Sequence, residues 1–138
     1  MIAALAAAMA ITGGASDVIL PGKADLPVIE GSSLMADCLM LQERLAASGK
    51  PFQCVGTPMA RADEITRAYG ASARTLGWLS SGGLANMVSF HRPLSDGRCE
   101  GLAFAGFPTT EAMAPSDLAM IIVLYSPTND CPPPRPVP

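Results

Sequence analysis

His91 is the only histidine in the chain, and histidine is the side chain best suited to proton transfer near neutral pH. Asp96 follows it in the same predicted hairpin, and a nucleophile could come from Ser80, Ser81 or Ser89. A serine, a histidine and an aspartate in contact would permit hydrolysis through a covalent intermediate. The stretch Ser80–Gly83 lacks the pattern of a nucleophile elbow, however. An ordinary strand histidine is therefore favoured over a small hydrolase using His91, and no residue is assigned as catalytic.

Trp78 is the only tryptophan, and it lies between a predicted helix and a predicted hairpin. Buried tryptophans anchor cores, whereas exposed ones are frequent in binding surfaces. The core interpretation is favoured, and the alternative is a contact residue in a binding patch. Trp78, His91 and Asp96 are accordingly the candidate binding residues.

Composition argues against several other classes of site. One histidine and dispersed acidic residues form no recognisable metal-ligand set, and Ser80–Gly83 is not followed by the lysine of a phosphate-binding loop. We therefore expect no metal and no cofactor. The formal net charge of −3 provides no basic surface for a polyanion, so nucleic acid is not an expected partner.

The chain has four cysteines, Cys38, Cys54, Cys99 and Cys131, and none of them forms a C-x-x-C pair. That spacing argues against a zinc ribbon and a thioredoxin-type redox site. An even number of cysteines in an exported chain predicts two disulfides. In a cytosolic protein the same residues would be buried thiols.

The N-terminus has the features of a signal peptide. Met1–Ile11 is an apolar run, and small residues follow it up to Ser16, after which cleavage is expected. Cleavage after Ala10 is an alternative. The run lacks a positively charged start, so either the signal is a weak one or translation begins upstream. An alanine-rich buried helix is the competing interpretation. The run is too short to span a bilayer, so the mature chain is predicted to be periplasmic or secreted, without a transmembrane segment.

Among the elements that must position these residues, the stretch Leu118–Tyr125 is central. It is an unbroken apolar run between two proline-containing turns, which indicates a strand covered on both faces. A buried helix is the alternative.

Two amphipathic helices are predicted upstream of this strand. The first follows the stripe Leu34, Cys38, Leu41 and Leu45, with Ser32 or Ser33 capping its start and Gly49 at its end. The second opens with Thr57 as cap and Pro58 at its first position, and ends at Gly77. Its predicted buried side comprises Ile65, Ala68, Tyr69, Ala73 and Leu76.

Further strands complete the predicted sheet. A strand over residues 52–55 would run back along the first helix and favour a Cys38–Cys54 disulfide. Strands over 84–92 and 98–107 flank an Asp-Gly turn. If the last strand pairs antiparallel with 98–107, Cys131 reaches Cys99.

The predicted register of the hairpin brings Phe90 opposite Ala103 and Val88 opposite Ala105. Its second face then carries Met87, Ser89, His91, Leu102 and Phe104. That face is too apolar to be left in water, so we expect a helix, the N-terminal arm or another subunit to cover it.

The 138-residue chain is predicted to form one α+β domain over residues 17–131, with two helices packed on a three- to four-stranded antiparallel sheet linked by two disulfides. Residues 17–33, with a short apolar patch at Val28–Ile29, are predicted to form an extended arm that includes at most one edge strand. A proline-rich disordered tail is predicted over 132–138.

For function, the sequence favours an exported interaction module, such as an inhibitor or accessory subunit with an unidentified protein partner. Self-association through the second hairpin face is a further possibility. The alternatives are the hydrolase and a small-ligand-binding domain with an apolar pocket between helices and sheet, lined by Met35, Met40, Met59 and Met87.

Overall fold

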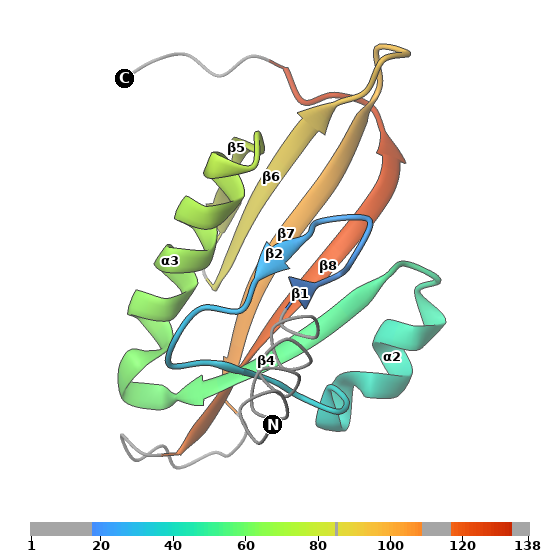
Figure 1. Cartoon of the computed structure of the whole chain (residues 1–138). Coiled ribbons are helices and arrows are strands. Elements are labelled where there is room, and N and C mark those ends of the chain that lie inside the picture. The colour runs from blue at the N-terminus through green and yellow to red at the C-terminus, as the bar shows by residue number, and fades with distance from the viewer. Residues whose placement is uncertain (1–17, 85, 109–116, 134–138) are drawn as a thin grey trace, which may run out of the picture.

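A six-stranded antiparallel sheet forms the body of the molecule (Figure 1). This computed structural model describes residues 18–84, 86–108 and 117–133. The strands are β1 (Val18–Ile19), β2 (Leu26–Pro27), β3 (Ser33–Leu34), β4 (Phe52–Pro58), β5 (Leu79–Leu84), β6 (Met87–Pro93), β7 (Cys99–Pro108) and β8 (Leu118–Asn129). The α-helices are α2 (Gln42–Ala47) and α3 (Ala62–Thr75), and each follows a short 3-10 helix, η1 (Leu39–Leu41) and η2 (Met59–Arg61).

The sheet order is β3-β4-β8-β7-β6-β5, and β1 pairs with β2 in a separate two-stranded sheet. The fold class is α+β, as predicted, but the main sheet has more strands than the predicted three to four. No helix within the described ranges is long and apolar enough to cross a membrane. The predicted signal peptide (1–16), most of the linker before β8 (109–116) and most of the tail (134–138) lie outside the described residues.

β8 lies inside the sheet, between β4 and β7, and pairs antiparallel with both. Ile121 and Val123 are buried on one face, while Met120 and Ile122 are buried on the other. Burial on both faces explains the unbroken apolar run, and the prediction of a central strand is confirmed. The strand continues past Pro127, where the β7–β8 register shifts and a residue without an N–H group is tolerated.

One face of the sheet carries the main core. From α3, the side chains of Ile65, Tyr69 and Ala73 pack on it, and the Tyr69 ring stacks on Phe104 at a centroid separation of 6.1 Å. Phe90 meets Phe104 edge to face. Three of the five residues predicted for the buried side of α3 are fully buried. Ala68 is half-buried, and Leu76 lies beyond the end of α3 and is exposed.

The β1–β2 hairpin covers the same face, where an extended arm was predicted. Ile19 and Leu26 are fully buried in the main core. A tight turn joins the two strands, in which the carbonyl of Leu20 accepts backbone hydrogen bonds and Asp25 accepts one from the N–H of Gly22. Val28 and Ile29 form no strand in the structure, but their side chains pack against the core. The arm is therefore a folded part of the domain.

The first predicted helix starts too early. Leu34 lies in β3 opposite Val55, and the N–H of Met35 donates to the carbonyl of Cys54. Leu39 has a positive φ of 54°, which interrupts any helix at that point. Residues 33–35 thus find hydrogen-bond partners along the edge of β4, and α2 begins only at Gln42, beyond the disulfide-bonded Cys38.

The second predicted helix also starts too early. Thr57 and Pro58 continue β4 and pair with Ala119 and Leu118, so Thr57 does not cap a helix. Its buried hydroxyl donates to the carbonyl of Gly31 instead. Pairing with a long neighbouring strand has prevailed over the local capping signal. The predicted end at Gly77 is confirmed by its positive φ of 94°.

The stretch Leu79–Leu84 forms β5, an edge strand, between the second helix and the hairpin, where the sequence predicts no strand before residue 84. Two glycines and two serines give it little intrinsic strand preference, so its pairing with β6 decides its structure.

The β6–β7 register differs by one residue from the predicted one. Val88 lies opposite Phe104 and Phe90 opposite Leu102. A longer turn explains the shift: the N–H of Leu94 donates to the carbonyl of Arg98, and Asp96 accepts from the N–H of Arg98. The large side chains of both strands therefore face α3 together, and Leu102 and Phe104 do not belong to the second face.

Candidate functional site

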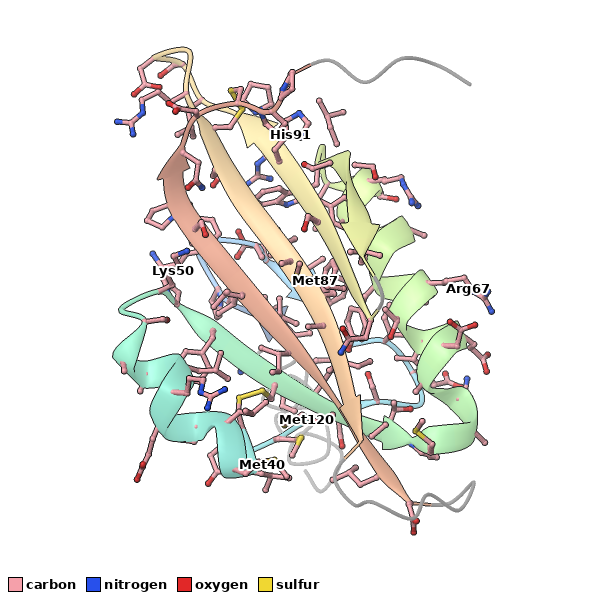
Figure 2. The ribbon with its side chains drawn as sticks, turned by 180° about the vertical axis from the view of Figure 1, so that it is seen from behind. Met40, Lys50, Arg67, Met87, His91 and Met120 are labelled. Carbon is pink, nitrogen blue, oxygen red and sulfur yellow. A yellow bond between two sulfur atoms is a disulfide. The ribbon has the colours of Figure 1, made fainter. Side chains whose placement is uncertain are left out.

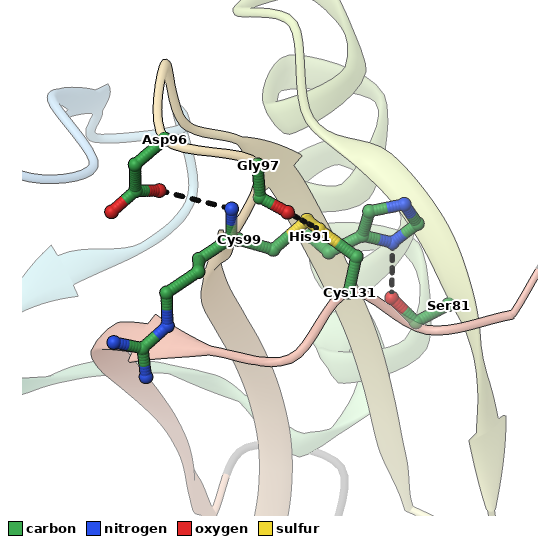
Figure 3. The surroundings of a disulfide bond; sticks show 7 residues. Ser81, His91, Asp96, Gly97, Cys99 and Cys131 are labelled. Atoms are coloured by element: carbon green, nitrogen blue, oxygen red, sulfur yellow. Dashed lines mark hydrogen bonds between the residues drawn. A yellow bond between two sulfur atoms is a disulfide. The ribbon is translucent and has the colours of Figure 1, made fainter.

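His91 lies on the sheet face opposite α3. Its partner in the neighbouring strand β5 is Leu79. Its Nδ1 is 2.7 Å from the hydroxyl of Ser81, and both residues are half-buried (Figure 3). Ser81 reaches the ring because the β5–β6 register shifts between Ser80 and Gly82. The sequence named Ser81 as a candidate partner, but this contact depends on β5, which was not predicted.

Asp96 does not complete a catalytic triad with this pair. Its carboxylate accepts a hydrogen bond of 2.9 Å from the N–H of Arg98 and stabilises the β6–β7 turn. Within the described part of the chain, His91 has no carboxylate partner that would orient it and stabilise its protonated form. The arrangement provides a polar pair on an otherwise largely apolar surface.

The two disulfides join the predicted cysteines. Cys38 bonds to Cys54 with a Cα–Cα distance of 5.5 Å, and Cys99 bonds to Cys131 with 5.0 Å. The first ties the segment before α2 to β4, and the second ties the chain after β8 to the start of β7. Both predicted pairings are confirmed. Among the residues that the structure describes, no group of three or more histidine, cysteine, aspartate or glutamate side chains could hold a metal ion.

Trp78 is only 1% exposed, so the core interpretation holds and the exposed-contact interpretation does not. The Arg92 guanidinium lies 4.3 Å from its ring centroid, and Tyr125 meets the indole edge to face. The indole N–H has no hydrogen-bond partner in the described structure. Trp78 closes the core at the end where α3 turns into β5.

A buried ionic network adjoins Trp78 and was not found from the sequence. Glu100 is 8% exposed, and its carboxylate accepts hydrogen bonds of 2.6 Å from both the Arg92 Nε–H and the Tyr125 hydroxyl. Arg92 also donates to the carbonyls of Leu76 and Lys23. The pairing of Arg92 with Glu100 can be predicted from the sequence only if the hairpin register is known, because that register places the two residues opposite each other.

Burial, together with the hydrogen bond to Glu100 and the negative charge of Glu100, raises the pKa of Tyr125 to about 12. The phenol therefore stays protonated at neutral pH and donates its hydrogen bond to the carboxylate. Each charged or polar group of the network has a partner, and the network joins the β1–β2 turn and the end of α3 to the sheet. Its role is structural.

The sheet face opposite α3 is only half covered (Figure 2). Over β4 and β8, η1 and α2 cover it: Leu41 of η1 and Leu45 of α2 pack against a buried cluster of Cys38, Cys54, Met120 and Ile122. Over β5, β6 and β7, the described residues leave it uncovered except at the turn end, where Cys131 bonds to Cys99. We call this uncovered part the open face, and its residues are Leu79, Met87, Ser89, His91, Gly101, Ala103 and Ala105.

The open face is apolar and shallow. Leu79 is 51% exposed and Met87 38% exposed, whereas Ala103 and Ala105 between them and β8 are half-buried and small. His91 and Ser81 add the one polar pair described above. Such a surface can bind another apolar surface closely, with a hydrogen-bonding group at its margin.

Comparisons with protein-family models, with curated proteins and with solved structures found no significant match to this chain.

Proposed function

We propose that this protein is an exported interaction module that binds a partner protein through the open face. Two disulfides support export, because such bonds persist in the periplasm and outside the cell but are rare in the cytosol. The uncovered apolar half of one sheet face supports binding, and it is the observation on which the proposal rests.

The neighbouring half of the same face indicates what kind of partner fits. There η1 and the short amphipathic helix α2 cover β4 and β8 through Leu41 and Leu45. The open face continues the same surface with smaller side chains, including Ala103 and Ala105, so a helix can approach the strands closely. The proposed partner therefore contributes an amphipathic helix that packs beside α2.

The chain's own α2 is not free to take this place. The Cys38–Cys54 disulfide fixes the residue directly before η1 and α2 to β4, at the covered end of the face. A helix tied at that point stays over β4 and β8. Among the described helices, α2 is thus held away from the open face, and the proposed occupant is a helix from another molecule.

Site-specific crosslinking in the producing cells tests this proposal. A photo-reactive p-benzoylphenylalanine replaces Ala103 on the open face, and in a matched control it replaces Ala71 on the exposed side of α3. We expect a discrete adduct with one other protein from position 103 and none from position 71. The additional change Leu79→Asp should remove the adduct without lowering the melting temperature, because Leu79 is largely exposed.

Two results would contradict the proposal. Equal or absent crosslinking at the two positions would mean that the open face binds no protein. An adduct formed only with a second copy of this chain would mean that the open face mediates self-association and does not bind a different protein.

A further inference from the structure

A pocket of about 500 Å³ lies between the first half of α3 and the end of the sheet where β6 begins and β7 ends. Ala62 and Thr66 of α3 form one wall, and Val88, Gly106 and Ile121 of three adjacent strands form the floor. These strand residues are on the α3 side of the sheet, since Val88 and Ile121 belong to the main core. The pocket is therefore separate from the open face, although Met87 borders both.

Gly106 is an unusual residue for its position. It lies inside the ten-residue strand β7, opposite Ile121, and the register is regular there. Glycine inside a strand costs about 0.5–1 kcal/mol relative to alanine, so it usually has a structural reason. Here its φ is not positive, and a Cβ built on it would meet none of the described atoms within 4 Å. Neither backbone strain nor close packing among those residues requires a glycine, and the open space above it admits the close approach of a ligand.

The lining indicates the chemistry of that ligand. Most of the surface is apolar, and Met59 and Met87, two of the four methionines predicted to line a pocket, contribute to it. Met35 packs in the other cluster instead, and Met40 is exposed. Methionine walls adapt to ligands of different shape.

The charged residues at the pocket neutralise each other. Arg67 and Asp63 form an ion pair of 2.9 Å, one turn apart on α3. Thr66 donates its hydroxyl hydrogen bond to the carbonyl of Ala62, and Asn86 donates to the carbonyl of Gly106. A charged ligand would have to compete with the existing ion pair, whereas an uncharged one would not.

We infer that this pocket binds a small uncharged apolar molecule that lies on Gly106. Its volume of about 500 Å³ is within the range of small-molecule sites, about 300–1,000 Å³. This site is independent of the proposed function, since either can exist without the other.

Fluorescence titration with N-phenyl-1-naphthylamine, an uncharged apolar probe, tests the inference on the full-length protein. We expect saturable enhancement of probe emission. The change Gly106→Ile fills the space above the strand, and it should weaken probe binding by about tenfold or more. Its melting temperature should be equal or higher, because isoleucine favours strands and its Cβ would meet no described atom within 4 Å.

Ala103→Ile is the matched control, because it adds a similar side chain to the same strand on the opposite face. It should leave probe binding unchanged. No saturable binding by the unmodified protein, or full binding by a folded Gly106→Ile variant, would overturn the inference. Tighter binding of the anionic probe 1-anilinonaphthalene-8-sulfonate that is lost in Arg67→Gln would also overturn it, because the site would then select anions.

Discussion

The two faces of β7 differ in the size of their side chains, although they belong to one strand. Glu100, Leu102 and Phe104 face α3, while Gly101, Ala103 and Ala105 face the other way. The large side chains build a core with Tyr69 and Trp78. The small ones leave a shallow surface, which the described helix α2 covers only as far as β8. The difference shows how a single alternating strand can supply stability on one side and an accessible surface on the other.

The largest effect is expected from the core side. Phe104→Ala should lower the free energy of unfolding by about 3–5 kcal/mol, because it leaves a cavity between α3 and the sheet. Ala103→Ser, one residue away on the open face, should change it by only about 0.5 kcal/mol. Urea denaturation measures both. Similar losses from the two variants would remove the distinction between the faces.

The Cys38–Cys54 disulfide should stabilise the half of the opposite sheet face that α2 covers. The double variant Cys38→Ala with Cys54→Ala should cost about 3 kcal/mol, since the bond closes a loop of 16 residues. Hydrogen exchange should accelerate in α2 while α3 keeps its protection. Loss of protection in both helices would show that the two faces fold as one inseparable unit.

The raised pKa of Tyr125 predicts that the stability of the protein depends on pH. Its folded pKa of about 12 exceeds its ordinary value of 10.0, so below pH 10 its contribution to stability is complete. As the pH rises from about 10 to about 12, the unfolded state ionises first, and up to about 3 kcal/mol is lost. Tyr125→Phe should lack this loss, as guanidinium unfolding at a series of pH values would show. If the free energy of unfolding depends on pH in the same way in both proteins, the Tyr125 phenol is exposed to water and not buried.

The smallest effect is expected from a substitution on the core side of the sheet, in α3. Gly70 lies inside α3, and a Cβ there would meet Phe90 at 3.5 Å, an ordinary packing distance. Gly70→Ala should therefore raise stability by about 0.5–1 kcal/mol through the helix preference of alanine. Thermal unfolding measures the change. A lower melting temperature would mean that α3 lies too close to β6 to admit a methyl group.

Prediction of the site from the sequence was limited by register. His91 and its candidate partner Ser81 were identified from residue type, but their contact required β5, which has weak strand signals of its own. No sequence pattern singles out Glu100 and Arg92, because only the observed pairing places them opposite each other. A shift of one residue in a strand exchanges its two faces, and the local sequence of a long turn does not fix that shift.

Local sequence alone determined the elements whose signals do not depend on distant partners. The apolar run from Leu118 favours a strand buried on both faces, and Gly49 and Gly77 mark helix ends because they adopt positive φ. The spacing of a helix and a returning strand favours the Cys38–Cys54 pair, whereas the Cys99–Cys131 pair follows only if the last strand lies beside 98–107. Tertiary structure decided where each helix begins, since β4 takes residues that local capping would assign to helices. It also decided which half of a sheet face stays open, because hydrogen bonds and burial between remote segments outweigh local preferences worth less than about 1 kcal/mol per residue.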